Sequence, residues 1–429
     1  MFSRSRWLLG GSFAVVLCSF GQIVASAEEI STSVAENLKQ GKIAAAEASL
    51  QKFLMNEPKH SQARFELGVV QVLSAIEKLG QDQYRYGALS RYVRAVPILR
   101  LPIPLNPEPQ AVTYQQVRQI FVDFQTRLMQ ADAELAMVEL NQELKLPLDL
   151  MAIRLDLTAD GKCEDDETLM QIFGVVNRTR PNDAAADMRV TFDAGDVPWL
   201  RGYCHLLSAL CDIVLAYDHQ RMFDLTGQLI YPKHVPAERS SESLDLVSDD
   251  PDFYRSFIDL VAAIHLMNLP LKEPARMESA RQHLLEMIRT SRQSWALIQA
   301  ETDNDREWLP NPKQTGVLRI PVTGELIDGW HAVLAEMEDL LEGRKLIPFW
   351  RDYLGSNRPD ADDEFPTEGR GVNLKRFFAE PRDFDLILII QGSGILPYVE
   401  HGQLSRPETW NELAGVFRGQ FFGFAVWFN

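Results

Sequence analysis

Apolar residues recur at helical spacing through most of the chain, and only the C-terminal part departs from this pattern. Apolar positions three or four residues apart form one face of an α-helix. The spacing predicts helix pairs over residues 28–78, a long helix over 113–144, and further helices over 164–176, 198–217, 253–269, 273–300 and 324–341. Thr113, with Gln116 three residues later, is typical of a capping box. We therefore expect a mainly α fold, arranged as a helical-repeat or multi-helix array.

The end of the chain has a different pattern. Residues 384–390 form a continuous apolar run that predicts a buried strand, and residues 421–428 predict a second strand able to pair with it. Four prolines between positions 102 and 109 forbid a helix there and favour an extended strap. We therefore divide the chain into a signal peptide (1–27), a repeat-like helical region (28–100), a Pro-rich strap (101–112), a helical core domain (113–345), and a mixed α/β region with a small β element (346–429).

The first residues have the features of a secretory signal peptide. Arg4 and Arg6 precede an apolar run over residues 7–20, and Ala25-Ser26-Ala27 provides a cleavage site. A membrane anchor is the alternative, but the run is short for a span, and no other stretch approaches one. The sequence thus predicts a secreted or periplasmic protein that is cleaved after Ala27 and has no membrane span afterwards.

The charge balance excludes several classes of partner. The chain has 43 Lys and Arg residues against 60 Asp and Glu residues, a net charge of −17. Nucleic-acid binding requires clustered Lys and Arg, and anionic membranes attract basic segments, so we expect neither partner. The sequence also has no His-x-x-His or Cys-x-x-Cys spacing, so no zinc site is indicated.

Three cysteines follow the predicted cleavage site. Cys204 and Cys211 lie two turns apart on one predicted helix, which is too far for a disulfide between them. One of them could pair with Cys163, or all three could be small buried side chains.

Residues 156–167 carry the clearest candidate chemistry. The twelve residues begin with Asp156 and end with Glu167, and Gly161 occupies the sixth place. Oxygens spaced along a short loop suit Ca²⁺, which takes six to eight of them. This spacing resembles the EF-hand calcium loop. The resemblance implies a bound Ca²⁺ with, as ligands, Asp156, Thr158, Asp160, Lys162 through its backbone carbonyl, Glu164 directly or through water, and Glu167.

The context of this loop predicts a structural role for the ion. No second loop of this kind is visible, and Pro147 interrupts the segment before it. We therefore expect a structural clip rather than a switch, with an affinity of about 10⁻⁴–10⁻³ M, as in extracellular modules. The ion would fasten residues 148–176 against the helix predicted over 198–217.

The N-terminal helices carry a second resemblance. Ala46, Leu50, Phe53 and Pro58, followed by Leu67-Gly68, resemble about one and a half tetratricopeptide repeats. The resemblance implies a helical hairpin and a groove for a partner protein. Ordinary hairpin packing is the alternative, because so few units cannot bury a core alone.

Polar residues on the apolar helix over 198–217 leave a third possibility open. Asp196, Arg201 and His205 lie on or near it, and buried polar groups need partners. They could form structural ion pairs or a catalytic cluster. The sequence therefore supports three hypotheses, namely an exported calcium-binding scaffold, an exported enzyme with a site near these residues, and an adaptor for another envelope protein.

Overall fold

The computed structural model describes residues 27–89, 100–141, 144–164, 167–176, 187–237, 258, 261–262, 264–353, 365–417 and 421–428. Residues 1–26 of the predicted signal peptide lie outside these ranges. The fold is mainly α with small sheets, as the sequence predicts.

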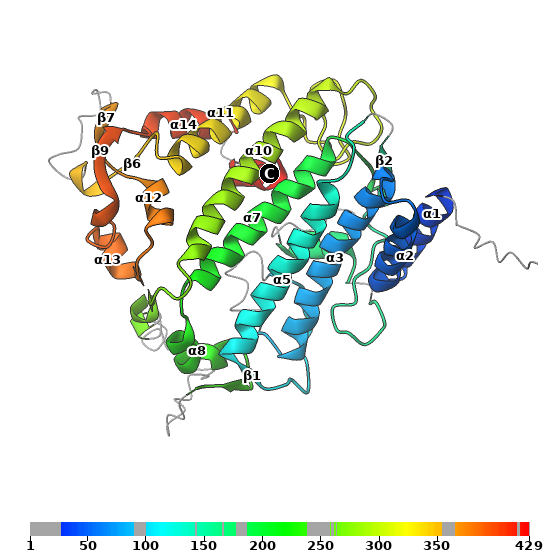
Figure 1. Ribbon diagram of the computed structural model, residues 1–429, viewed down its shortest axis with the longest axis horizontal. Helices are drawn as coiled ribbons and strands as arrows, with labels where there is room; N and C mark the ends of the chain where they lie inside the picture. Colours follow the sequence, from blue (N-terminus) through cyan, green and yellow to red (C-terminus); the bar gives the residue numbers. More distant parts are fainter. Residues whose placement is uncertain are drawn as a thin grey trace, which may run out of the picture.

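The long helices form a row through the molecule. Figure 1 shows α3, α5, α7 and α10 side by side, with α1 and α2 at one end and the C-terminal sheet at the other. The long helices are α1 (Ala27–Lys39), α2 (Ile43–Asn56), α3 (Ser61–Arg85), α5 (Tyr114–Leu135), α7 (Asp196–Ala216), α10 (Ala275–Ala300) and α11 (Gly324–Leu341). The shorter ones are α6 (Leu169–Val176), α8 (Gln220–Thr226), α12 (Leu374–Ala379), α13 (Leu386–Gln391), α14 (Pro407–Val416) and α15 (Phe421–Phe428), with 3-10 turns η2 (Gly227–Leu229), η3 (Trp350–Asp352) and η5 (Leu396–Tyr398).

Short sheets join segments that are distant in sequence. β1 (Val112–Thr113) runs parallel to β4 (His234–Val235), and β5 (Asn268–Leu269) runs antiparallel to β8 (Phe384–Asp385). β2 (Lys145–Asp149) pairs antiparallel with β3 (Arg189–Asp193), with Leu146 opposite Phe192. Near the C-terminus, β6 (Ile347–Pro348), β7 (Glu368–Val372) and β9 (Val399–Gln403) form an antiparallel sheet in that order.

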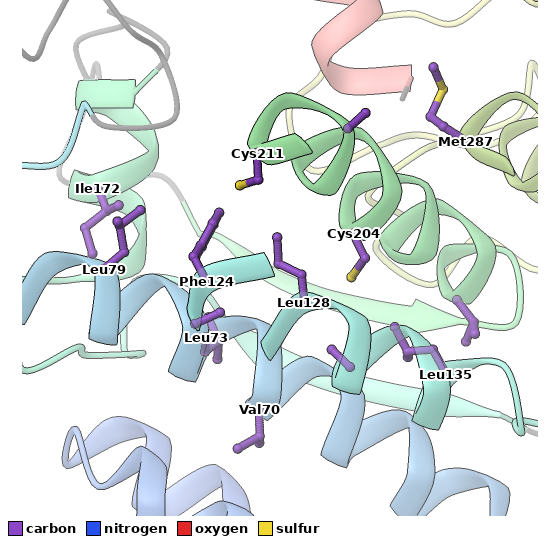
Figure 2. Close-up of a cluster of buried hydrophobic side chains, with 14 of the residues drawn as sticks. Val70, Leu73, Leu79, Phe124, Leu128, Leu135, Ile172, Cys204, Cys211 and Met287 are labelled. Atoms are coloured by element: carbon purple, nitrogen blue, oxygen red, sulfur yellow. The ribbon is translucent and has the colours of Figure 1, made fainter. Parts of the chain in front are cut away.

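One large hydrophobic core takes in residues of every long helix and of α15. A second, smaller core lies at the C-terminal sheet and is formed by Phe349, Val372, Ile395 and Tyr398. On α3, a Cβ at Gly68 would lie 2.5 Å from Leu135 Cδ2, so this glycine lets α3 and α5 approach closely. Figure 2 shows Cys204 and Cys211 of α7 in the core beside Leu128 of α5. The three cysteines of the described chain are free thiols, so the disulfide considered for Cys163 does not form.

The sequence pattern predicts some helix ends correctly and others incorrectly. Thr113 Oγ1 accepts from the Gln116 amide at 3.3 Å, and Gln116 Oε1 accepts from the Thr113 amide at 2.8 Å, which confirms the capping box. The helix over 324–341 is confirmed as α11. By contrast, α5 ends at Leu135 instead of 144, and α6 begins at Leu169 instead of 164. Residues 268–269 form β5 instead of a helix end.

The two predicted C-terminal strands are wrong. The run over 384–390 contains the short β8 and then α13, because Asp385 Oδ1 caps the helix by accepting from the Leu388 amide at 2.9 Å. Ile390 is 64% exposed, so the run is not buried. Residues 421–428 form α15, which buries Phe428 against Trp295. The two segments do not pair.

α7 is the central helix of the row and packs most extensively on α10 and α5. Among the described helices, it alone has the length and apolar composition of a membrane span, a test that the core helix of a soluble protein also passes.

Candidate functional site

The loop over 156–167 leaves the turn after β2 and leads into α6. Its two ends lie side by side, because the Leu155 amide donates to the Glu167 carbonyl at 3.0 Å. Leu155 and Leu157 are fully buried and anchor the first half of the loop in the core. Residues 165 and 166 lie outside the described part of the chain.

The carboxylate of Asp156 organises the first half of the loop. Its Oδ2 accepts from the Gly161 amide at 2.9 Å, and its Oδ1 accepts from the Asp160 amide at 3.3 Å and the Thr158 hydroxyl at 3.4 Å. Gly161 has φ +78°, a left-handed conformation that glycine adopts readily. Asp160 in turn accepts from the Lys162 amide at 2.8 Å. The predicted ligands of the first half are therefore brought together around one turn.

Glu167 closes the loop from the other end. It is 2% exposed, and its two oxygens accept from the amides of Leu157 at 3.0 Å and Glu164 at 2.8 Å. A carboxylate oxygen that accepts one hydrogen bond retains a second lone pair. The donor set of the loop, carboxylates with a hydroxyl and a carbonyl, fits a hard cation such as Ca²⁺.

Sequence reasoning missed a residue of α3 that lies beside this loop. Glu77 Oε1 accepts from the Asp156 amide at 2.9 Å, and Gln81 Nε2 donates to the Asp156 carbonyl at 2.9 Å. Burial, with smaller contributions from Asp156 and Glu167, raises the pKa of Glu77 to about 7. Nothing in the local sequence of α3 links Glu77 to a loop about eighty positions later, so only the fold reveals it.

The loop packs on N-terminal elements of the fold. A Cβ at Gly80 of α3 would lie 2.6 Å from Leu157 Cδ2, and one at Gly41 would lie 2.0 Å from Cys163 Sγ. The described contacts of the loop thus run to α3 and to the α1–α2 turn. That an ion fastens residues 148–176 against the helix over 198–217 stays a prediction.

A second group of acids lies where β3, α7 and α10 meet. Asp193, Glu301 and Glu307 each place a carboxylate oxygen within 4.8 Å of the others, and Asp196 adjoins them through its bond to the Asp193 amide at 3.0 Å. We call these four residues the acid cluster. Burial raises the pKa of each carboxyl, to about 8 for Glu301 and about 7 for Glu307.

No Lys or Arg within the described chain forms an ion pair with the acid cluster. Lys145 binds instead to the neighbouring Asp303 at 3.0 Å and Asp305 at 2.8 Å. The carboxylate oxygens of Asp193 and Glu301 lie within 4.8 Å of each other, and the charge of Asp193 adds to burial in raising the pKa of Glu301. The cluster therefore holds protons near neutral pH, and its oxygens are also of the kind that hard cations bind.

The sequence contained only part of this signal. Acids alternate at 301, 303, 305 and 307, a pattern that could have drawn attention to the segment. The pairing of β2 with β3 and the crossing of α7 with α10 bring Asp193 and Asp196 to it, and those contacts are not local.

The structure does not bring Asp196, Arg201 and His205 together as one group. Asp196 belongs to the acid cluster and lies about 13.5 Å along α7 from His205, at 1.5 Å per residue. Arg201 Nε donates to Asp132 Oδ1 of α5 at 2.7 Å, and His205 Nε2 lies 3.5 Å from the same oxygen. Arg201 and His205 therefore come together in a buried network, while Asp196 does not join them.

A surface hollow of about 370 Å³ lies beside α1. It is lined by the C-terminal half of α1, by the paired strands β2 and β3, and by Arg306. Its floor is apolar and buried, with Leu38 from α1 and Val190 from β3, and Lys39 and Arg189 lie at its exposed rim.

The sequence matches no known protein-family model, and comparisons with curated proteins and with solved structures returned no match.

Proposed function

We propose that this protein is an exported, calcium-binding helical scaffold in which one Ca²⁺, held by the 156–167 loop, fastens that loop to α3. The observation that carries the proposal is the gathering of Glu77, Asp156 and Glu167 at one end of the loop. Neither Glu77 nor Asp156 has an ion pair with Lys or Arg among the described residues. A divalent cation would neutralise this charge and would favour the closed loop.

The proposed ligands are those implied by the EF-hand resemblance. The carboxylates of Asp156, Asp160 and Glu167 would supply most of the charge, with Thr158 and the Lys162 carbonyl as neutral donors and Glu164 direct or through water. The loop follows a strand and a turn instead of a helix, so no pair of helices is available to open. We therefore infer a stabilising ion with an affinity of about 10⁻⁴–10⁻³ M.

Calorimetric titration of residues 28–429 with Ca²⁺ tests this function. We expect one site, and at ten times the dissociation constant the ion should stabilise the fold by about 1.4 kcal/mol. Glu167→Gln should abolish binding and the rise in melting temperature. Because Glu167 also accepts two amide protons, Asp160→Asn at an exposed position is the second variant, and exposed Glu57→Gln on another element is the matched control.

Two results would reject the calcium site. One is an unchanged melting curve and no heat of binding across millimolar Ca²⁺. The other is binding that Glu167→Gln and Asp160→Asn leave as strong as Glu57→Gln does, which would place the ion elsewhere. Detection of the mature chain in the periplasm or medium, with its N-terminus at Glu28, tests the export part of the proposal.

A second candidate function is an adaptor that holds a partner protein at the N-terminal helices. The hollow beside α1 favours it, because its apolar floor suits a partner segment that carries apolar side chains. Ala35→Glu would place a carboxylate in the hollow and should release any envelope protein that the wild-type chain retains in a pull-down. Retention that is equal for both chains would contradict this role.

A further inference from the structure

Two imidazoles, one buried and one partly buried, meet at the interface between α7 and α10. Nδ1 of His205 lies 2.9 Å from Nδ1 of His283, and the ring centroids are 5.2 Å apart. Two ring nitrogens at this distance form a hydrogen bond only when one carries a proton and the other does not. One N–H therefore lies in the contact, donated by either ring.

The outer nitrogen of each ring faces a carboxylate. His205 Nε2 lies 3.5 Å from Asp132 Oδ1, and His283 Nε2 lies 3.8 Å from Asp212 Oδ2. A neutral pair has two protons on four nitrogens, and one of them occupies the contact. One outer nitrogen therefore presents a bare lone pair to a carboxylate. Consistent with this, His205 Nε2 and Asp212 Oδ2 are buried with no hydrogen-bond partner in the described part of the chain.

The acids that act on the pair are themselves partly neutralised. Asp132 accepts from Arg201 Nε at 2.7 Å, and Asp212 accepts from Arg276 Nη1 at 2.7 Å. The acids that act on the rings are Asp132 from α5, Asp212 from α7 and Glu286 from α10, and Arg201 from α7 opposes them at His205. Burial outweighs these acids, so an added proton on either ring is unfavourable.

We propose that His205 and His283 form a proton-sensitive latch between α7 and α10, which accommodates one added proton and opens when a second is bound. The first proton fills the bare outer nitrogen, which can then donate to its carboxylate while the Nδ1–Nδ1 bond remains. The second must bind at the contact itself. Two N–H groups on two cationic rings would then oppose each other at 2.9 Å, so the contact must separate.

The location of the latch gives its opening a structural consequence. α7 and α10 form the most extensive helix interface of the fold, and Asp132 extends the network to α5. Separation of the rings would loosen the three central helices in acid. Burial lowers the pKa of both rings, to about 4 for His205, which agrees with a latch that stays closed at neutral pH.

Nuclear magnetic resonance of the full chain labelled with ¹⁵N-histidine tests the proton count. At pH 8, we expect one ring protonated at Nδ1 and the other at Nε2, assigned from spectra of His205→Gln and His283→Gln. Titration from pH 8 to pH 3 should show two coupled steps at least one pH unit apart. Two Nε2-protonated rings at pH 8, or two independent titrations near pH 6.5, would overturn the latch. Because the decisive titration uses the wild-type chain, poor folding of a variant does not remove the test.

Unfolding equilibria provide the second readout. The unfolded chain binds two protons at these histidines in acid and the closed latch binds at most one. Each pH unit below 6.5 should therefore cost up to a hundredfold in the wild-type folding equilibrium before the folded chain binds its first proton, and up to tenfold afterwards. Either single Gln variant keeps an amide in the contact and one titrating ring, so its slope should be smaller by about one proton. His401→Gln, at an exposed position on β9, should retain the wild-type slope. Single variants with the wild-type slope would overturn the proposal.

Discussion

The acid cluster makes a sharp prediction about stability and pH. Its members have raised pKa values, so the folded state holds protons that the unfolded state has already released. For Glu301, this difference begins above its ordinary pKa of 4.5 and is complete above about 8. In metal-free solution, raising the pH through this window should therefore destabilise the protein.

Glu301→Gln isolates this contribution. The Gln side chain has the size of Glu301 and carries no charge, and its oxygen can still accept from Gln314, now 3.2 Å away. A rise from 4.5 to about 8 would correspond to an upper bound of about 5 kcal/mol, at about 1.4 kcal/mol per pKa unit. Since Glu301 is only half-buried, solvent screening should reduce the gain at pH 8.5 to about 1–2 kcal/mol.

Urea unfolding with EDTA at pH 8.5 and pH 5.5 measures the effect. The Gln variant should be more stable than wild type at pH 8.5, and its advantage should be much smaller at pH 5.5, only one pH unit above the ordinary pKa of 4.5 at which the difference begins. Glu57→Gln, which removes an exposed acid, should follow wild type at both values. A Gln variant that is no more stable at pH 8.5, or that gains equally at both pH values, would refute the reasoning.

Four further substitutions test the packing, a helix cap and an exposed position. Gly68→Ala should destabilise the fold by about 1–3 kcal/mol in urea unfolding, because the new Cβ would lie 2.5 Å from Leu135. The control is Gly415→Ala, whose Cβ meets nothing within 4 Å and which should raise the free energy of unfolding by about 0.5–1 kcal/mol. Thr113→Ala should cost about 1 kcal/mol through loss of the capping box, and an unchanged midpoint would contradict the cap. Ile390→Glu should leave the free energy of unfolding within about 0.5 kcal/mol of wild type, since the side chain is 64% exposed. A large loss of stability would instead support the prediction of a buried strand.

Features that depend on neighbouring residues could be predicted from the sequence. The cap at Thr113 and the bounds of α11 follow from residues a few positions apart, and the structure confirms both. The mainly α fold follows in the same way, because periodicity reports which face of each helix is buried.

The error at 384–390 shows where this reasoning fails. A short apolar run has no periodicity that separates strand from helix. The deciding signals were at its ends, since Asp385 caps α13 and Gly392, at φ 105°, terminates it. The run is also exposed, so its composition alone was a poor guide to burial.

The candidate sites also differ in whether they depend on residues that are near or distant in the sequence. The order of oxygens over 156–167 is local, so the loop and its organisation around Asp156 could be anticipated. Glu77, the acid cluster and the His205–His283 contact each depend on which helices and strands become neighbours. Side chains that bear charge are spread through a chain with 60 acids, and no spacing rule distinguishes the few that the fold brings together.

The raised pKa values of the buried acids and the lowered pKa of His205 change the stability of the fold in opposite directions as the pH changes. The acid cluster and Glu77 have raised pKa values, so their contribution to stability falls as the pH rises from 4.5 to about 8. His205 has a lowered pKa, so its contribution falls as the pH drops from 6.5 to about 4. Only the first effect operates above pH 6.5 and only the second below pH 4.5. The stability of the metal-free chain should therefore peak between these values, and a cation that neutralises buried carboxylates would extend the stable range toward alkaline pH.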